Sequence, residues 1–128
     1  MNSGDSMRCP KEATFPRPSE ANGNTFFIVR HGHSEANKQE IICSTPVRGQ
    51  DPKYGLTEDG LSQSKEAAKL IAESVGGLAP IPGVLVVSSD YSRAKQTAEV
   101  IADTVTKAPV RICEALRERH FGDFEVTF

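Results

Sequence analysis

Polar residues that could bind and transfer a phosphoryl group follow two apolar runs of the sequence. The first run, residues 26–29, leads into Arg30, His31 and Asn37. The second, residues 84–87, leads into Arg93. Guanidinium groups bind phosphate oxygens through paired hydrogen bonds, and the N-termini of helices favour anions. The two arginines, with a cluster of hydrogen-bonding groups that includes Asn37, therefore predict a phosphate-binding site.

His31 is the candidate nucleophile of this site. Neighbouring cations disfavour an imidazolium, so we expect a lowered pKa and a neutral ring at physiological pH. A neutral imidazole can attack phosphorus, and arginines can stabilise the charge of the group in transfer. The sequence therefore predicts a phosphohistidine at His31. Water or a second substrate hydroxyl would then accept the phosphoryl group.

Glu118 is the candidate proton donor for the leaving alkoxide. It lies in the charged run 117–119, beyond a third apolar run at residues 110–113. A carboxyl group among phosphates could have the raised pKa that a general acid needs. Spacing alone leaves Glu114 and Asp90 as alternatives.

A metal site is a competing interpretation of His31 and His33. Their His-x-His spacing resembles that of some zinc sites at the ends of strands. Arg30 beside a divalent cation would be unfavourable, and no further set of ligands is evident. The three cysteines lie far apart and form no Cys-x-x-Cys pair, so they predict no zinc site either. We therefore expect no metal and no other cofactor.

Apolar runs and amphipathic segments alternate along the chain. The predicted buried strands are residues 26–29, 84–87 and 110–113. The predicted helices are residues 34–42, 57–74 and 92–106, with 43–55 as a loop. Buried strands that alternate with amphipathic helices indicate an α/β fold with a mainly parallel sheet. In such sheets ligands bind at the carboxyl ends of the strands, where His31, Arg93 and Glu118 would meet.

Two helices are expected to bury apolar stripes. For residues 57–74, with Thr57 as N-cap, the predicted stripe comprises Leu61, Ala67, Ala68, Leu70 and Ile71. For residues 92–106, it comprises Ala94, Thr97, Ala98, Ile101 and Val105. Both stripes have the spacing of a helix packed on a sheet.

Length and charge limit the classes of function. The chain has 128 residues, with 15 basic and 17 acidic side chains and a net charge of −2. This length suits one domain, and the charge balance gives no reason to expect nucleic acid or an anionic membrane as partner. Residues 1–24 contain scattered proline and no periodicity, which predicts a flexible tail. The absence of a signal-like apolar stretch favours the cytoplasm.

Four ordered blocks carry a resemblance to a known family. They are Arg-His-Gly-His-Ser-Glu-Ala-Asn at 30–37, Leu-Thr-Glu-Asp-Gly-Leu-Ser-Gln at 56–63, Ser-Ser-Asp-Tyr-Ser-Arg-Ala-Lys-Gln-Thr-Ala at 88–98 and Leu-Arg-Glu-Arg-His-Phe-Gly-Asp-Phe-Glu at 116–125. In this order they resemble the histidine phosphatase superfamily, also called the phosphoglycerate mutase-like family. The resemblance implies a three-layer α/β/α fold and a metal-independent enzyme.

The resemblance also assigns roles to residues of this chain. It implies that His31 is phosphorylated, that Arg30, Asn37 and Arg93 bind phosphate, and that Glu118 donates the proton. The fourth block looks more like those of the phosphatases than those of the glycolytic mutases. We therefore expect hydrolysis of a small phosphorylated metabolite, with mutase-type phosphoryl transfer as the alternative.

The family's catalytic domain is longer than this chain. It contains a second histidine in a Ser-His-Gly-like block, and a later strand that lies between the first two. The resemblance therefore implies that residues 25–128 are the N-terminal part of a truncated domain. It predicts unpaired edges and exposed apolar faces on the strands at 26–29 and 84–87. A truncated, non-catalytic form that binds phosphate or regulates the longer protein remains the alternative.

Overall fold

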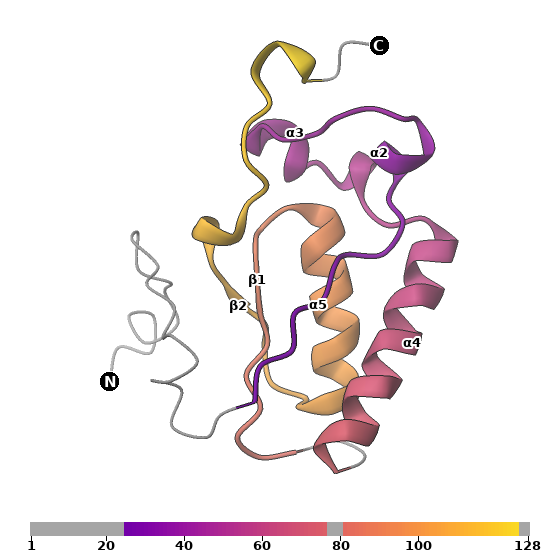
Figure 1. Cartoon of the computed structure of the whole chain (residues 1–128), viewed down its shortest axis with the longest axis vertical. Coiled ribbons are helices and arrows are strands. Elements are labelled where there is room, and N and C mark those ends of the chain that lie inside the picture. The colour runs from indigo at the N-terminus through magenta and orange to yellow at the C-terminus, as the bar shows by residue number, and fades with distance from the viewer. Residues whose placement is uncertain (1–24, 77–80, 126–128) are drawn as a thin grey trace.

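Two long helices packed beside a small parallel sheet form the body of the molecule, with short helices above them (Figure 1). The computed structural model describes residues 25–76 and 81–125. The predicted tail at residues 1–24 lies outside the described residues. No helix in the described part of the chain is long and apolar enough to cross a membrane.

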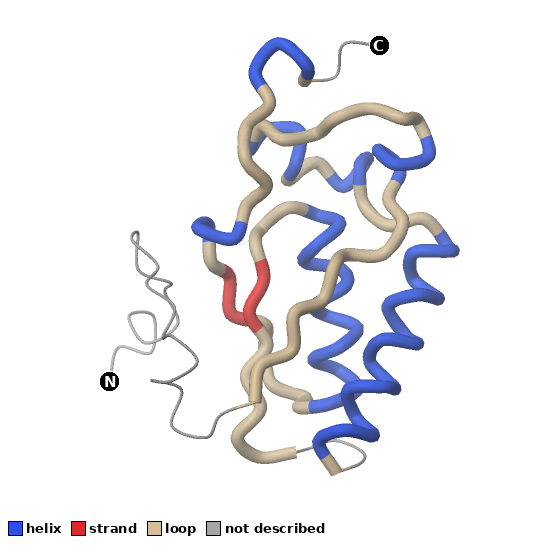
Figure 2. The backbone as a smooth tube through the Cα atoms, viewed as in Figure 1, coloured by secondary structure: helices blue, strands red, loops and turns tan. Residues whose placement is uncertain are grey.

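The sheet is formed by two of the three predicted strands. Residues 84–87 and 110–113 pair in parallel, as expected, but their regular parts are only β1 (Val87–Ser88) and β2 (Arg111–Ile112) (Figure 2). The register places Val87 opposite Arg111 and Ser88 opposite Ile112. Both strands run toward the short helices, so their carboxyl ends meet at the same edge.

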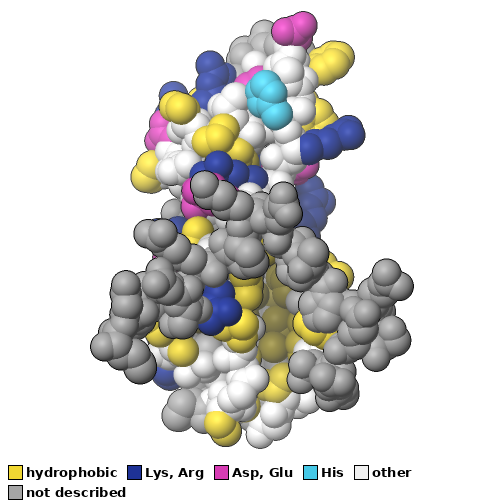
Figure 3. Space-filling model, turned by 90° about the vertical axis from the view of Figure 1, so that its left-hand side faces the viewer, with side chains coloured by type: hydrophobic (Ala, Val, Ile, Leu, Met, Phe, Trp, Pro, Cys, Tyr) yellow, Lys and Arg dark blue, Asp and Glu magenta, His cyan; other side chains and the backbone are white. Residues whose placement is uncertain are grey.

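The prediction of a buried strand at residues 26–29 is wrong for the described structure. The segment has no regular structure, and Phe26 and Ile28 are 59% and 100% exposed. The physical reason is that the sheet between residues 25 and 125 offers this segment no neighbouring strand. In the second apolar run, at residues 84–87, Leu85 is likewise 58% exposed. The face of the molecule that lies on the left in Figure 1 carries a recessed strip of hydrophobic side chains (Figure 3).

Helix α4 (Glu58–Val75) begins and ends where the sequence predicts. The Thr57 side chain accepts a hydrogen bond from the Gly60 N–H, and Gly76 ends the helix with a left-handed φ of 112°. Its buried face is Gly60, Ser64, Ala68 and Ala72. The predicted stripe is therefore wrong for Leu61 and Leu70, which are 40% and 63% exposed, whereas Ile71 is half-buried against the core. Small residues four apart let the neighbouring backbone approach closely.

Helix α5 (Ser92–Val105) buries most of its predicted apolar stripe. Thr97, Ala98, Ile101 and Val105 are buried, while Ala94 is half-buried. The core cluster joins Ala68, Ala72, Ile101 and Val105 from the two long helices. Apolar residues of the incoming strand segment, including Val84 and Val86, pack against it.

Helix α2 (Glu35–Lys38) is shorter than the predicted helix at 34–42. It starts at a capping box in which Ser34 and Asn37 exchange hydrogen bonds. It ends because Glu40 adopts a left-handed φ of 56° and the Ile41 N–H bonds the Ala36 carbonyl. This hydrogen bond is the one that closes a Schellman motif.

The remaining short helices lie around the carboxyl edge of the sheet. The predicted loop at 43–55 contains α3 (Pro46–Gly49) and the 3₁₀-helix η2 (Pro52–Tyr54). After β2 come two further 3₁₀-helices, η3 (Glu114–Leu116) and η4 (Gly122–Phe124). These segments surround the end of the sheet at which the predicted site residues gather.

Candidate active site

A pocket of about 260 Å³ lies at the carboxyl edge of the sheet. It is lined by His31, Ser89, Tyr91, Arg93, Ala94, Leu116, Arg117 and Glu118. These residues come from the segment after residues 26–29, from the turn between β1 and α5, from the first turn of α5, and from the segment after β2. The structure therefore brings together three of the five predicted site residues: His31, Arg93 and Glu118.

One hydrogen bond defines the protonation pattern of His31. Its Nδ1 lies 2.7 Å from the Gly32 carbonyl oxygen. A carbonyl oxygen only accepts, so Nδ1 carries the proton and the neutral ring has its lone pair on Nε2. Nε2 is thus the atom of His31 that is able to attack an electrophile.

The pKa of His31 lies below its ordinary value. Burial of the ring is the largest cause, and the positive charges of Arg93 and Arg30 lower the pKa further. The hydrogen bond to Gly32 and the charge of Glu118 act in the opposite direction. The predicted direction is confirmed, but desolvation rather than the neighbouring cations contributes most.

The guanidinium of Arg93 is buried and fixed at the pocket wall. Its Nη1 donates a 3.0 Å hydrogen bond to the Cys43 carbonyl, and its guanidinium carbon lies 5.4 Å from the centroid of the Tyr91 ring. Only 8% of the residue is exposed. The Arg93 guanidinium is thus a buried cation beside a neutral histidine, and it can bind an anion in the pocket.

Glu118 is the acidic side chain among the pocket-lining residues. The alternative Asp90 is bound through both carboxylate oxygens by Arg117, which holds the pKa of Asp90 below its ordinary value. An acid with a lowered pKa is a poor proton donor at neutral pH. Glu114 is exposed and lies outside the pocket lining, 3.6 Å from the same guanidinium.

Arg30 and Asn37 lie apart from the pocket wall. Arg30 is exposed, although its charge still reaches His31. The Asn37 side chain accepts hydrogen bonds from the Ser34 N–H and hydroxyl, both at 3.0 Å, and so caps α2. The described structure therefore gives Asn37 a capping role and leaves both phosphate-binding predictions without direct geometric support.

The backbone of His31 is held against α4 and α5 through Gly32. The Gly32 N–H donates a 3.1 Å hydrogen bond to Thr97 Oγ1 in α5. A Cβ on Gly32 would collide with the backbone of Gly60 in α4. The absence of a side chain at Gly32 thus permits a close contact between two backbones.

His33 lies outside the pocket lining and bonds other residues. Its Nδ1 lies 2.9 Å from Thr57 Oγ1, and its N–H donates to Gln63 Oε1 at 2.8 Å. The described residues contain no group of three or more His, Cys, Asp or Glu side chains that could hold a metal ion. The His-x-His pair therefore finds no third ligand in this part of the chain.

Sequence reasoning missed two features around the pocket. The first is Arg117, which lines the pocket and bonds Asp90. The sequence signal for this pairing was limited to the opposite charges of two residues that follow neighbouring strands. Glu125 accepts hydrogen bonds from Ser44 and Thr45, from both their backbone N–H groups and their hydroxyls. No local pattern signals this contact, because the two segments lie about 80 positions apart.

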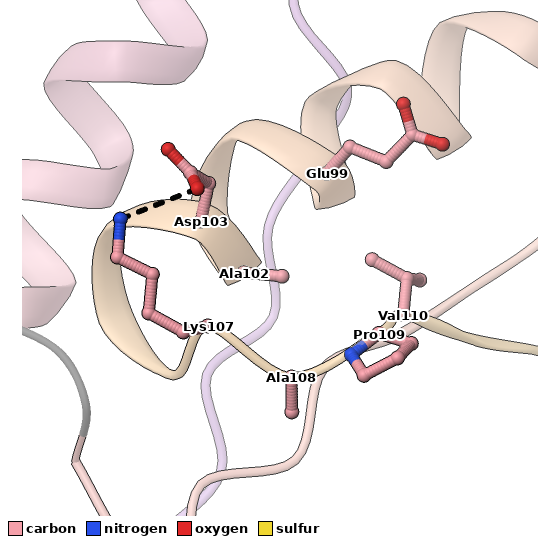
Figure 4. Close-up of a pocket in the computed structure, with 7 residues that line it drawn as sticks. All are labelled: Glu99, Ala102, Asp103, Lys107, Ala108, Pro109 and Val110. Atoms are coloured by element: carbon pink, nitrogen blue, oxygen red, sulfur yellow. Dashed lines mark hydrogen bonds and ion pairs between the residues drawn. The ribbon is translucent and has the colours of Figure 1, made fainter.

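A second hollow of about 250 Å³ lies at the C-terminal end of α5 (Figure 4). Its charged residues are Glu99, Asp103 and Lys107, and Lys107 pairs with Asp103 at 3.3 Å. The lining contains no histidine, cysteine, serine or arginine. It therefore lacks the groups needed for phosphoryl transfer.

The comparison with protein families agrees with the geometry. The family model of the histidine phosphatase superfamily (branch 1) matches residues 26–127. The chain belongs to this superfamily. The match spans all four sequence blocks and every residue that lines the pocket.

Relatives that resemble this chain are named as mutases and phosphatases. It is 32% identical over 102 residues to a 2,3-bisphosphoglycerate-dependent phosphoglycerate mutase of Parvibaculum lavamentivorans, covering 78% of this chain and 43% of that protein. It is 33% identical over 98 residues to a glucosyl-3-phosphoglycerate phosphatase of Mycolicibacterium vanbaalenii, covering 77% and 37% respectively. The chain thus spans about two fifths of the length of these relatives.

A solved structure of a superfamily member has the same fold. It is a mycobacterial glucosyl-3-phosphoglycerate phosphatase in complex with VO3, with a TM-score of 0.59 and 30% sequence identity. The superposition covers 76% of this chain and 41% of that protein. The α/β, phosphoglycerate mutase-like architecture is therefore established for this chain in incomplete form.

Proposed function

We propose that this chain transfers a phosphoryl group from a small phosphorylated metabolite to His31 and that water then releases it as phosphate. The observation that carries the proposal is the hydrogen bond between His31 Nδ1 and the Gly32 carbonyl. It leaves Nε2 unprotonated in a pocket that also holds Arg93 and Glu118. A nucleophile, a cation and a carboxyl group are the three groups that this chemistry requires.

The first step forms a bond from His31 Nε2 to phosphorus and breaks the bond from phosphorus to the ester oxygen. Arg93 stabilises the negative charge on the phosphoryl oxygens. Glu118, in its protonated form, gives its proton to the leaving oxygen, and an alcohol departs.

In the second step the Glu118 carboxylate takes a proton from water as the water oxygen attacks phosphorus. The bond from phosphorus to Nε2 breaks, so the products are inorganic phosphate and a neutral His31. Arg30 and Asn37 are proposed as further phosphate ligands. Asn37 would have to direct its amide nitrogen toward the phosphate, because its oxygen is used by Ser34.

The relatives support small phosphorylated metabolites as the substrate class, since one is a phosphoglycerate mutase and the other is a glucosyl-3-phosphoglycerate phosphatase. Mutase-type transfer is the second candidate, because phosphoglycerate mutases are as similar to this chain as the phosphatase. A form that binds phosphate without turnover is the third. Assays with phosphoglycerates as phosphoryl acceptors separate mutase activity from hydrolysis.

The proposal is tested by phosphate release from simple phosphomonoesters. We expect His31→Ala to abolish release and Glu118→Gln to reduce it about 10²–10⁴-fold for esters of alkyl alcohols. His120→Gln, at an exposed histidine outside the pocket lining, is the matched control and should retain activity. Full activity of His31→Ala would refute the proposal, and phosphate binding without release would favour the non-catalytic form.

A further inference from the structure

The carboxyl ends of β1 and β2 are joined by an ion pair between Asp90 and Arg117. Arg117 Nε lies 2.7 Å from Asp90 Oδ1, and Nη2 lies 2.5 Å from Oδ2. The two side chains are only 21% and 22% exposed. A bidentate pair of this kind fixes the orientation of the guanidinium as well as its distance from the carboxylate.

Asp90 is the fixed member of the pair. It lies in the short turn between β1 and the first residue of α5, and the next N–H, that of Tyr91, bonds the hydroxyl of Ser89. Tyr91 is 2% exposed, and its ring lies 5.8 Å from the Arg117 guanidinium carbon. The Arg117 side chain is therefore held by a rigid turn and by an aromatic face.

Glu118 follows Arg117 directly and has no such support of its own. Its side chain is exposed, and no hydrogen bond or ion pair to another residue between 25 and 125 restrains it. It nevertheless lines the same pocket as His31, whose pKa is raised by its charge. The placement of its backbone thus depends on the neighbour that is anchored to Asp90.

We propose that Asp90 and Arg117 are positioning residues that hold Glu118 where it can protonate the leaving group at the His31 site. This inference rests on the proposed function, because it takes Glu118 as the proton donor. General acid catalysis needs the carboxyl within hydrogen-bond reach of the leaving oxygen. A displacement of about 1 Å can cost about 10²-fold in rate.

The first test compares two substrates that differ in their need for a proton donor. Glycerol phosphate has an alkoxide leaving group that requires a proton, whereas the nitrophenolate of p-nitrophenyl phosphate departs without one. For Arg117→Lys, which keeps the charge but loses the paired hydrogen bonds, we expect kcat on glycerol phosphate to fall about 10–100-fold. On p-nitrophenyl phosphate it should change less than about twofold. Equal losses on both substrates would overturn the proposal, because a purely structural defect does not discriminate between leaving groups.

A double variant tests whether the pair acts through Glu118. Arg117→Lys combined with Glu118→Gln should be no slower than Glu118→Gln alone, because the positioned group is already gone. Additive losses would mean that Arg117 acts independently, and would overturn the inference. Asp103→Asn is the matched control, since it breaks the exposed ion pair with Lys107 at the far end of α5.

A readout without turnover separates this inference from the proposed function. The pKa of His31 is measured by NMR titration in the unmodified chain, in each single variant and in the double variant. Glu118 raises that pKa, so displacement of Glu118 in Arg117→Lys should lower it toward the value in Glu118→Gln. Lack of any activity together with this pKa change would refute the proposed function alone. An unchanged pKa in Arg117→Lys would refute the positioning role alone.

Discussion

Gly32 and Gly60 are in backbone contact, which ties the residue next to His31 to the first turn of α4. A Cβ on Gly60 would in turn collide with the backbone of His33. The segment that carries the candidate nucleophile is thus positioned by two glycines and by the hydrogen bond from Gly32 to Thr97.

Gly60→Ala should destabilise the chain, although alanine is normally the better residue inside a helix by about 1 kcal/mol. The added Cβ has to displace the backbone of His33, and overpacking of this kind costs about 1–3 kcal/mol. Denaturant unfolding measures the change. Ser62→Ala, at an exposed position on the same helix, is the control and should lie within about 0.5 kcal/mol of the unmodified chain. A stabilised Gly60→Ala variant would contradict the contact.

Tyr91→Phe should lower the free energy of unfolding by about 1–3 kcal/mol. The Tyr91 hydroxyl donates a hydrogen bond to the Ser44 carbonyl, and both residues are buried. Loss of the donor leaves the carbonyl unsatisfied away from water. The matched control is Tyr54→Phe, because Tyr54 is also a buried residue but its hydroxyl bonds no other residue in the described ranges. Equal effects of the two substitutions in thermal and denaturant unfolding would argue against the Tyr91 hydrogen bond.

Glu125→Gln should destabilise the chain at neutral pH by about 1–3 kcal/mol, with the difference vanishing in acid. Burial alone would raise the pKa of Glu125, but hydrogen bonds from Ser44 and Thr45 outweigh it and hold the pKa below its ordinary value. A lowered folded-state pKa gives stability that is present above the unfolded pKa and is lost as pH falls through the folded one. Unfolding of both forms between about pH 7 and pH 3 checks this, and a pH-independent difference would be inconsistent with it.

Opposite pKa changes at His31 are expected from two neutralising substitutions. Arg93→Gln removes a charge that lowers the pKa of His31, so the pKa should rise; Glu118→Gln removes one that raises it, so the pKa should fall. Because the pKa of His31 in the folded state is below the ordinary value, the folded chain binds fewer protons than the unfolded chain at pH values between the two pKa values. Stability should therefore decrease as pH drops from about 6.5 toward the folded pKa. NMR titration of His31 measures both shifts, and shifts of the same sign would contradict the assigned charges.

The sequence predicts the helices of this structure better than its strands. Thr57 and Gly76 mark the ends of α4 correctly because capping depends on local hydrogen bonds and backbone conformation. The segment at residues 26–29 has an equally clear apolar pattern, yet its side chains are exposed. A strand requires a partner from a distant part of the chain, and periodicity does not reveal whether that partner is present.

The pocket was predictable only in part. His31, Arg93 and Glu118 each follow an apolar run, so the rule that ligands bind at strand ends brings them together. Asn37 lies outside the pocket lining and its short side chain bonds Ser34 within one turn, so its contact with phosphate stays a prediction. The buried face of α4 was mispredicted since Ser64 and Gly60 serve close packing with neighbouring backbone, which hydrophobicity does not measure.

The most direct test of the account is the location of the transferred phosphoryl group. The chain is incubated with a small phosphoryl donor, kept at neutral to alkaline pH to preserve phosphohistidine, and mapped by mass spectrometry and ³¹P NMR. The account predicts a single phosphoryl group on Nε2 of His31, which is absent from His31→Ala and unchanged in His120→Gln. A phosphoryl group on His33, or phosphate release with no phosphohistidine at His31, would contradict it.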